Sequence, residues 1–525
     1  MRLAIAALVA VLAAPTAAEA FCGFYIDTQG NEMVNNATQV VLMRQGTRTV
    51  LSMQNNYQGP PKDFAMVIPV PVVLKETDVK TLPKSVFAKV DAMSSPRLVE
   101  YWEQDPCNFD SEDEEDAAPV RRRASVKMSK KSADDGDYGV TVEAKFDVGE
   151  YQVVILSAKD STGLDRYLRD QQYKIPAGAE PLLKPYVAAG SKFFVAKVNP
   201  AKVKFEHGMA QLSPLRFHYD TEEFSLPIRL GLVSSNGTQD LIVNILSPGQ
   251  RYELANYKNV VIPTNFDVKD EVRTRFGEFY AALFDRTVQQ NPGAIVTEYA
   301  WDASSCDPCP GPTLDGNDFQ TLGADVMTGG NDDEMPRKRG RRGGGGGFVL
   351  TRLHARYGKE VPNDLVFRTA SPIVGGREIR QPNNELEHGA VADSYNNFQG
   401  RYAIRHAWTG PVACQNPARG RWGGPPAGAQ LAKPQGATDT AFAPRGTMQI
   451  PLLVEKDIPE IGVKVGVPIE LSPPSKISGS PIPSTGQVQS KGQGCACDSG
   501  NAGGFAGGAT LLGLVLFGMR RRRCS

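Results

Sequence analysis

The sequence has few of the residues, and none of the short motifs, that mark many enzyme active sites. Its 525 residues include five histidines, a small supply for acid–base catalysis or metal binding. It contains neither a His-Glu-x-x-His pattern nor a Gly-x-Ser-x-Gly pattern. The glycine run before Phe348 lacks the Gly-Lys-Ser/Thr ending of a phosphate-binding loop. The sequence therefore carries no signature of a zincin protease, a nucleophile-elbow hydrolase or a P-loop nucleotidase.

The net charge is zero, because 58 basic residues balance 58 acidic ones. No global field favours nucleic acid or an acidic polymer as a partner, and we expect no nucleic acid to bind. The basic cluster at 337–342 could contact nucleic acid or anionic glycans, but a flexible solvated loop is the favoured interpretation.

Long apolar runs occur only at the two ends of the chain. At the first end, Arg2 precedes the apolar residues 3–14, and Ala18 and Ala20 form a small-x-small cleavage site. This arrangement is typical of a secretory signal peptide over residues 1–20, with a mature chain that begins at Phe21. An uncleaved anchor is the alternative, but the apolar core is short for a membrane span.

The other end carries an apolar run at 505–519 that can be extended back to Ala502, followed by four arginines. We expect a marginal transmembrane helix at about 502–519, since glycines within it lower the insertion signal. The positive-inside rule then leaves everything before Cys495 outside the inner membrane. A buried core helix is the alternative, but it would leave the arginines hard to solvate. They are Arg520, Arg521, Arg522 and Arg523.

Between these ends, strands and helices come in blocks, which predicts an α+β fold that is rich in strands. The folded body should cover residues 21–454, with disordered charged insertions at about 108–137 and 329–347 and a Pro/Gly-rich linker at 455–494. The acidic run at 110–116 lacks the spacing and turn glycine of a calcium loop, so a solvated insertion is favoured.

Apolar periodicity and turn residues predict the elements of the body. Two strands should flank a turn at Gln45-Gly46 within 38–53, and the strand at 64–72 should lie at a sheet edge or end its pairing at its prolines. A capping box should open a helix at Thr162, and residues 235–237 should form a hairpin turn between strands 226–234 and 240–246. Further strands are expected at 97–102, 139–146, 151–156, 192–198, 202–206, 215–219, 295–301, 348–357, 364–368, 402–408 and 447–454, and helices at 85–93, 162–173, 180–189 and 270–290.

The eight cysteines divide into five in the body and three in the tail. Outside the cytoplasm we expect body cysteines to form disulfides, and five is odd, so at least one lacks a partner within the body. Cys306 and Cys309 have the spacing of a redox dithiol, but the Pro-Gly-Pro that follows disfavours the helix that would activate a thiolate. A structural disulfide is favoured over redox chemistry and metal ligation, which stay open. The body cysteines are Cys22, Cys107, Cys306, Cys309 and Cys414.

Isolated polar residues give only weak catalytic candidates. His207 and His218 fall in strand-rich sequence, where a packed or solvent-facing imidazole is the usual outcome. Glu298 could serve a glycosidase, but that chemistry needs a second carboxylate at a defined separation. We expect no catalytic residue, metal or cofactor from these patterns.

Two stretches resemble known families. The tail, with Gly494, Cys495 and Cys497 before the short helix and the arginines, resembles the MYXO-CTERM sorting domain of myxobacterial surface proteins, over residues 495–525. This resemblance implies a sorting protease that cleaves near Cys495, and a cysteine that becomes a modified anchor at the cell surface or outer membrane. The body is similar to the domain of unknown function 2330 family, through segments 22–25, 63–71, 212–217, 226–230 and 299–309. That family implies export and no mechanism.

Together these patterns predict an exported, disulfide-stabilised protein, anchored through its C-terminal helix and displayed at the cell surface. The leading hypothesis is a noncatalytic module that binds a ligand or a neighbouring protein. The alternative is an extracytoplasmic hydrolase or thiol oxidoreductase without a recognisable motif.

Overall fold

The computed structural model describes most of the body of the chain. The chain divides into two units, Met1–Pro483 and Ser484–Ser525, and every described residue lies in the first. The described residues are 24–26, 34–58, 65–107, 139–171, 173, 175, 178–206, 209–234, 238–327, 347–358, 361, 363–382, 385–426, 443–446 and 448–469. The predicted signal peptide, Cys22, both charged insertions apart from Gly347, and the tail with the helix predicted at 502–519 lie outside them.

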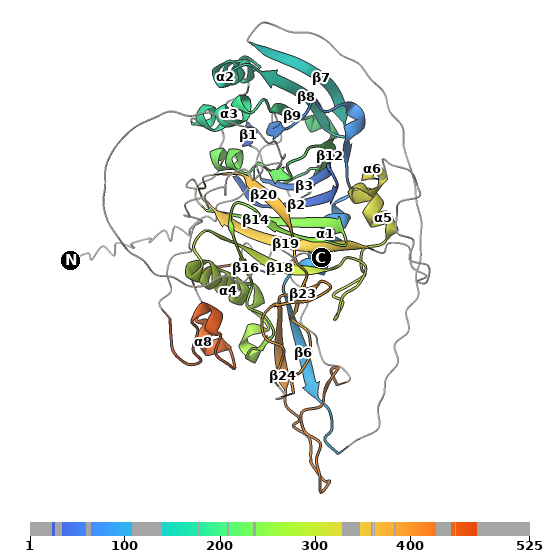
Figure 1. Cartoon of the computed structure of the whole chain (residues 1–525), viewed down its shortest axis with the longest axis vertical. Coiled ribbons are helices and arrows are strands. Elements are labelled where there is room, and N and C mark those ends of the chain that lie inside the picture. Colours follow the sequence, from blue (N-terminus) through green and yellow to red (C-terminus); the bar gives the residue numbers. More distant parts are fainter. Residues whose placement is uncertain are drawn as a thin grey trace, which may run out of the picture. The chain divides into compact units, whose positions relative to one another are not determined.

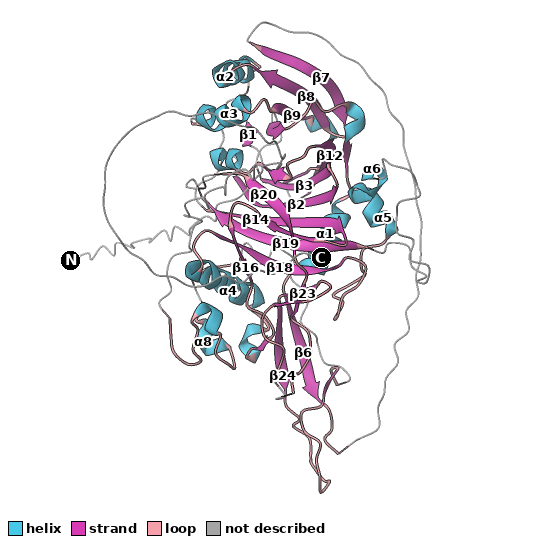
Figure 2. Ribbon diagram, viewed as in Figure 1, coloured by secondary structure: helices cyan, strands magenta, loops and turns pink. Residues whose placement is uncertain are grey.

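An eleven-stranded mixed sheet forms the centre of this unit (Figures 1 and 2). β14 (Gln239–Pro248) lies in its middle, where it pairs parallel to β2 (Val34–Gln45) and antiparallel to β19 (Phe348–Tyr357). The predicted hairpin at Gln45-Gly46 is confirmed, since Gln45 faces Arg48 across the turn and Gly46 has a φ of 56°. The other strands are β3 (Arg48–Gln58), β5 (Val79–Thr81), β12 (Leu215–Asp220), β16 (Lys258–Val261), β18 (Ala294–Asp302), β21 (Ile373–Gly375), β22 (Val391–Ala392) and β23 (Asn397–Gln399).

A five-stranded antiparallel sheet, in the order β1-β4-β9-β8-β7, packs against one face of the central sheet through a shared apolar core. Within it, β4 is paired on both sides, so an edge position is wrong for this strand. Pairing with β1 ends at Val67, however, and does not reach Pro69, which has no N–H to donate to a ladder hydrogen bond. The strands are β1 (Phe24–Ile26), β4 (Ala65–Val70), β7 (Val140–Val148), β8 (Tyr151–Ala158) and β9 (Lys192–Val198).

Two helices cover the opposite face of the central sheet. α4 (Phe276–Gln290) presents an apolar stripe at helical spacing that includes Phe279, Leu283 and Phe284, and all three are fully buried. α1 (Lys84–Ser94) buries Phe87 and Val90 in a second, separate cluster. Between these two apolar clusters the same face of the sheet carries polar side chains, which form the site described below.

A smaller sheet, with β6 (Arg97–Glu103) and β24 (Arg401–His406) paired in parallel, continues from the body (Figure 1). β17 (Phe266–Asp267) and β25 (Trp422–Gly423) complete it. A disulfide between Cys107 and Cys414 joins the segments that leave β6 and β24. We call β6, β24, β25 and residues 104–107 and 407–421 the arm.

The remaining elements are short. Two small sheets contain β10 (Lys204–Glu206) with β11 (Met209–Gln211), and β13 (Ser225–Leu226) and β15 (Arg251–Leu254) on either side of β20 (Leu365–Ala370). Helices and helical turns are η1 (Glu76–Asp78), α2 (Ser161–Asp170), α3 (Ala179–Ala188), η2 (Pro200–Lys202), η3 (Arg229–Ser234), η4 (Asp270–Val272), α5 (Gly316–Phe319), η5 (Gln320–Ala324), α6 (Asp325–Met327), α8 (Ile450–Leu453) and η6 (Pro459–Ile461).

Three further sequence predictions are wrong in detail. Residues 226–234 are a strand only at Leu226 and continue as the turn η3, since Pro227 has no N–H for a ladder. Residues 447–454 contain the helix α8, whose second residue Pro451 occupies a first-turn position where a missing N–H costs nothing. Asp160, not Thr162, caps α2 through the backbone N–H of Gly163.

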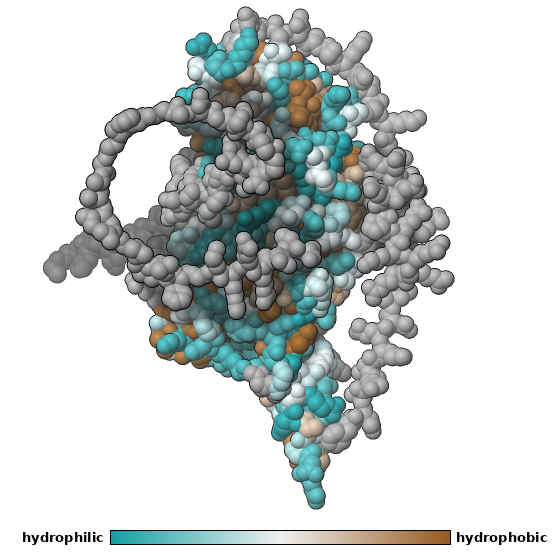
Figure 3. Space-filling model, in the orientation of Figure 1, coloured by the Kyte–Doolittle hydropathy of each residue, from teal (hydrophilic) through white to brown (hydrophobic). Residues whose placement is uncertain are grey.

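The strand-rich α+β fold is confirmed. Among the residues described above, no helix is long and apolar enough to cross a membrane. On the face drawn in Figure 3, hydrophobic residues of the described part occur in separate groups among hydrophilic ones.

Candidate functional site

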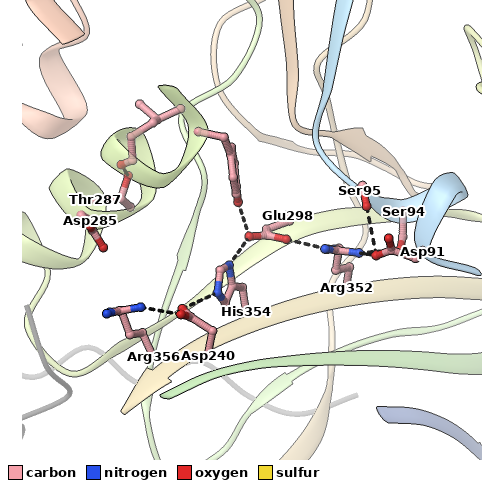
Figure 4. Close-up of polar contacts among 12 residues, drawn as sticks. Asp91, Ser94, Ser95, Asp240, Asp285, Thr287, Glu298, Arg352, His354 and Arg356 are labelled. Carbon is pink, nitrogen blue, oxygen red and sulfur yellow. Dashed lines mark hydrogen bonds and ion pairs between the residues drawn. The ribbon is translucent and has the colours of Figure 1, made fainter. Parts of the chain in front are cut away.

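Strand β19 places three basic side chains on the helix-covered face of the central sheet. Arg352, His354 and Arg356 alternate with Leu353 and Ala355, which point into the opposite apolar core. Arg352 is fully buried and His354 is 2% exposed, because α1 and α4 cover this face. Charges in such a position need partners, since an unpaired buried charge is costly. Figure 4 shows these partners.

Glu298 on β18 is the partner that joins two of these basic groups. It lies at a break in the register between β18 and β19, where Val296 pairs with His354 and Tyr299 pairs with Arg352. This bulge places the carboxylate between the two side chains. Its Oε2 accepts from Arg352 Nε at 2.6 Å, and its Oε1 lies 2.6 Å from His354 Nδ1.

The same Oε1 of Glu298 accepts a hydrogen bond from the hydroxyl of Tyr280 on α4. Burial alone would raise the pKa of Glu298, but the nearby charges of His354 and Arg352 outweigh it and lower the pKa to about 2. Glu298 is 0% exposed, so it is an enclosed carboxylate that stays ionised.

His354 uses both of its ring nitrogens. While Nδ1 faces Glu298, Nε2 lies 3.0 Å from Oδ1 of Asp240 on β14, and the ring of Phe284 stacks on the imidazole at 3.8 Å between centroids. Burial lowers the pKa of His354, but the two carboxylates outweigh that effect and the net pKa is raised. With an acceptor at each nitrogen, the imidazolium is the form that this environment favours.

Arg352 connects the sheet to helix α1. Its NH1 donates to Asp91 at 2.7 Å and to the hydroxyl of Ser94 at 3.2 Å. Ser94 in turn donates to the side chain of Asn244 on β14, at 2.9 Å. Since Ser95 also donates to Asp91, the last turn of α1 is fixed over the sheet by polar contacts and not only by its apolar stripe.

At the opposite end, Asp240 receives two more basic groups. Arg356 pairs with its Oδ2, and Arg445 NH2 lies 3.1 Å from the same atom. Arg445 comes from a distant part of the chain, and its NH1 also pairs with Asp285 on α4. Burial lifts the pKa of Asp240, but Arg445, Arg356 and His354 outweigh it and lower the pKa. For Asp285, burial dominates and the pKa is raised.

We call this set the charge network. With His354 as an imidazolium, four cationic groups balance four acidic groups, and each cationic group contacts at least one acidic group. The cations are Arg352, His354, Arg356 and Arg445, and the acids are Asp91, Asp240, Asp285 and Glu298.

The geometry limits what the charge network can do chemically. A general base must reach a proton on a substrate, but both nitrogens of His354 already face carboxylates and the residue is buried. Glu298 likewise has both oxygens engaged. The arrangement is suited to holding α1 and α4 on the sheet, and the members closest to solvent are Arg445 and Asp285.

Of the weak catalytic candidates in the sequence, only Glu298 lies in this network. His218 lies on β12, half-buried, with Nε2 3.5 Å from Asp78, and burial lowers its pKa. His207 lies outside the described residues.

The Cys306–Cys309 disulfide is present, as expected for the favoured structural interpretation. The loop between the two cysteines is held by side chains of the body. Arg97 donates to the carbonyl of Pro308 at 2.6 Å, and Gln399 donates to that of Asp307 at 2.7 Å. No helix begins at Cys309, since the next one is α5 at Gly316, so the feature that activates redox thiolates does not follow this motif.

The second disulfide, Cys107–Cys414, spans 307 residues of sequence. The expectation of disulfides in the body is therefore confirmed for four of its five cysteines. Cys22 and the tail positions Cys495 and Cys497 lie outside the described residues.

Sequence reasoning missed most of the charge network. Arg352, His354 and Arg356 follow a period of two, which normally indicates a solvent-exposed strand face. The missed signal is the neighbouring strand β14, where Asp240 and Asn244 recur on the same face and offer partners. Among the described residues, no group of three or more His, Cys, Asp and Glu side chains is placed to hold a metal ion.

Comparison with known proteins gives a family and no closer relative. Residues 16–368 match the family described as "Uncharacterized protein conserved in bacteria (DUF2330)", and this range contains every member of the charge network except Arg445. No curated protein and no solved structure matches the chain. Because the match covers more than half of the sequence, the protein belongs to the DUF2330 family of uncharacterised bacterial proteins.

Proposed function

We propose that this protein is an exported module that is displayed at the cell surface and acts by binding, without catalysing a reaction. The observation that carries this proposal is the enclosure of the charge network. Its central acid and base, Glu298 and His354, are both buried. Their polar atoms are hydrogen-bonded to each other and to Tyr280, Arg352 and Asp240. For this network to turn over a substrate, at least one of these two groups would have to reach that substrate.

The two disulfides support the exported location. Disulfides persist in oxidising compartments and are rare in the cytoplasm. Cys107–Cys414 joins the outer segments of the arm, and Cys306–Cys309 closes a loop beside Arg97. A signal peptide over residues 1–20, cleaved after Ala20, is the proposed route of export.

The tail supplies the proposed anchor. In this account the helix at 502–519 stops in the inner membrane, and Arg520, Arg521, Arg522 and Arg523 orient it. A sorting protease of the kind implied by the MYXO-CTERM resemblance then cleaves near Cys495. Cys495 or Cys497, next to Gly494, becomes the modified anchor at the cell surface or outer membrane.

A substrate screen tests the noncatalytic role. The intact chain is purified and incubated with peptide, glycan and ester libraries, and its disulfides are assayed by insulin reduction. We expect no turnover above that of a heat-denatured sample. Turnover that Cys306→Ser removes would establish the thiol oxidoreductase alternative, and turnover that it leaves unchanged would establish a hydrolase.

Intact mass tests the processing. Protein isolated from the surface of its native cells should begin at Phe21 and should have lost residues after the region of Cys495. Retention of residues through Arg523 would contradict the processing, and retention of residues 1–20 would contradict cleavage of the leader.

A further inference from the structure

Arg445 is surrounded in the body by groups of the kind that bind a cation. Its guanidinium lies between two carboxylates on different elements, Asp240 on β14 and Asp285 on α4. The guanidinium carbon is 5.9 Å from the centroid of the Phe284 ring, within the range of a cation–π contact. Two carboxylates and an aromatic ring are the groups that recognise guanidinium in proteins.

The groups around the guanidinium and Arg445 itself come from different parts of the chain. Asp240, Phe284 and Asp285 all lie within residues 16–368, the part of the chain that matches the family. Arg445 lies beyond that range, in residues 443–446, which form neither helix nor strand.

The outer end of the charge network is also its most accessible part. The side chain of Asp285 is 16% exposed and that of Arg445 is 11% exposed, whereas Glu298 is completely buried. Removal of the Arg445 side chain would leave Asp240 with Arg356 and His354 as partners. Asp285, in contrast, would lose its ion pair with Arg445.

We propose that Asp240, Asp285 and Phe284 form a guanidinium-binding site, which Arg445 fills from within the chain and which accepts an arginine side chain of a partner protein when Arg445 is withdrawn. The inference names a ligand class for the binding role proposed above, and its biological use rests on that role. The existence of the site does not depend on that role, because guanidinium binding can be measured without any partner.

Chemical rescue tests the site directly. The intact Arg445→Ala protein is titrated with methylguanidinium chloride up to about 20 mM, well below the molar range in which guanidinium denatures proteins, and its Tm is recorded. Methylammonium chloride at the same concentration controls for charge and ionic strength. The variant should remain folded, because Met448 and Ile450, just after Arg445, pack into the apolar cluster around α4.

The expected result is a saturable rise in the Tm of Arg445→Ala of about 1–2 °C with methylguanidinium, and a much smaller rise with methylammonium. The Tm of the wild type should not respond, because Arg445 already occupies the site. The Tm of Arg445→Ala combined with Asp285→Asn should not respond either. Arg275→Ala serves as the matched control, because Arg275 pairs with Glu278 at an exposed position on the same helix.

An arginine-containing peptide extends the test to the proposed ligand. A peptide with the sequence of residues 443–453 should raise the Tm of Arg445→Ala, and the same peptide with alanine in place of arginine should not.

Three outcomes would overturn the proposal. They are no saturable response of Arg445→Ala to methylguanidinium, an equal response to methylammonium, and an equal response of the Asp285→Asn double variant. If Arg445→Ala aggregates, Arg445→Gln is purified with and without methylguanidinium, and failure of the ligand to increase recovery of folded protein also overturns it. None of these results bears on the noncatalytic role, which is contradicted only by turnover in the substrate screen.

Discussion

The Nδ1 atom of His354 lies 2.6 Å from the Oε1 atom of Glu298, in a part of the molecule that solvent does not reach. The pair links two adjacent strands, β19 and β18, beneath helix α4. It is the centre of a chain of ion pairs that runs from Asp91 on α1 to Asp285 on α4. This chain of ion pairs is a structural element that connects the two helices to the sheet.

Glu298→Gln should destabilise the protein strongly. The substitution keeps the shape of the side chain but leaves Arg352 and His354 facing a neutral amide, and removal of one partner from a buried ion pair typically costs about 3–5 kcal/mol. Equilibrium unfolding in urea gives the free energy of unfolding. The control is Glu278→Gln, whose partner Arg275 is half-exposed, for which the expected loss is below about 1 kcal/mol. Equal losses for the two variants would contradict the structural role of Glu298.

Tyr280→Phe should cost more than Tyr402→Phe. Both tyrosines are fully buried beside α4, but the hydroxyl of Tyr280 donates to the charged Glu298, whereas that of Tyr402 donates to the carbonyl of Pro263 at 3.0 Å. Hydrogen bonds to charged groups contribute about 1.5–3 kcal/mol, and neutral ones about 0.5–1.5 kcal/mol. Thermal and urea unfolding of the two variants measure the difference, and the reverse order would argue against an ionised Glu298.

Stability should fall on the alkaline side through His354. Burial lowers the pKa of this group, but its two carboxylates raise it above the unfolded value of about 6.5. The folded state therefore holds the proton more tightly, so the contribution is complete below the unfolded pKa and is lost as pH rises through the folded pKa. The free energy of unfolding is measured against pH for the wild type and for His354→Gln. The difference between the two profiles is the contribution of His354. His388→Gln, at an exposed position, is the control for the loss of a histidine.

On the acid side, Glu298 sets a different window. Its pKa is about 2 in the folded protein, against 4.5 as its ordinary value, so the unfolded state takes up a proton first as pH falls. The contribution of Glu298 is present above about pH 4.5 and is lost progressively toward pH 2. The free energy of unfolding of the wild type should therefore fall more steeply than that of Glu298→Gln across this interval. Parallel curves would contradict the lowered pKa.

The two disulfides should contribute unequally to stability. Cys107–Cys414 closes a loop of 307 residues, whereas Cys306 and Cys309 are three positions apart. Chain entropy then predicts a contribution of about 6 kcal/mol for the first bond and about 2 kcal/mol for the second. Unfolding of the Cys107→Ser/Cys414→Ser and Cys306→Ser/Cys309→Ser double variants gives the comparison. A larger loss for the short loop would show that local contacts, such as those of Arg97 and Gln399, outweigh loop length.

The sequence predicts most of the strands well, because their apolar residues follow the pleat. Residues 192–198 and 348–357 form strands over the predicted ranges, and the helix predicted at 270–290 exists from Phe276 onward. Two of the errors occur where proline changes the local geometry, at Pro227 and Pro451. Helix periodicity and strand alternation are local properties, so a single sequence is enough to detect them.

The charge network could not be predicted in the same way, because it depends on contacts between distant residues. His354 and Asp240 are 114 positions apart, and Arg445 and Asp240 are 205 apart. An alternating Arg-x-His-x-Arg pattern looks the same whether water or a helix covers it. Only the packing of α1 and α4 over β19 decides that these charges are buried.

The protonation state of His354 tests the central claim most directly. Nuclear magnetic resonance of the intact protein with ¹⁵N-labelled histidine, assigned by comparison with His354→Gln, reports whether each ring nitrogen carries a proton. At pH 6.5, where an ordinary histidine is half protonated, we expect both nitrogens of His354 to be protonated in most molecules, as an imidazolium that balances Glu298 and Asp240 requires. A neutral imidazole at that pH, with one unprotonated nitrogen, would contradict the balanced charge network.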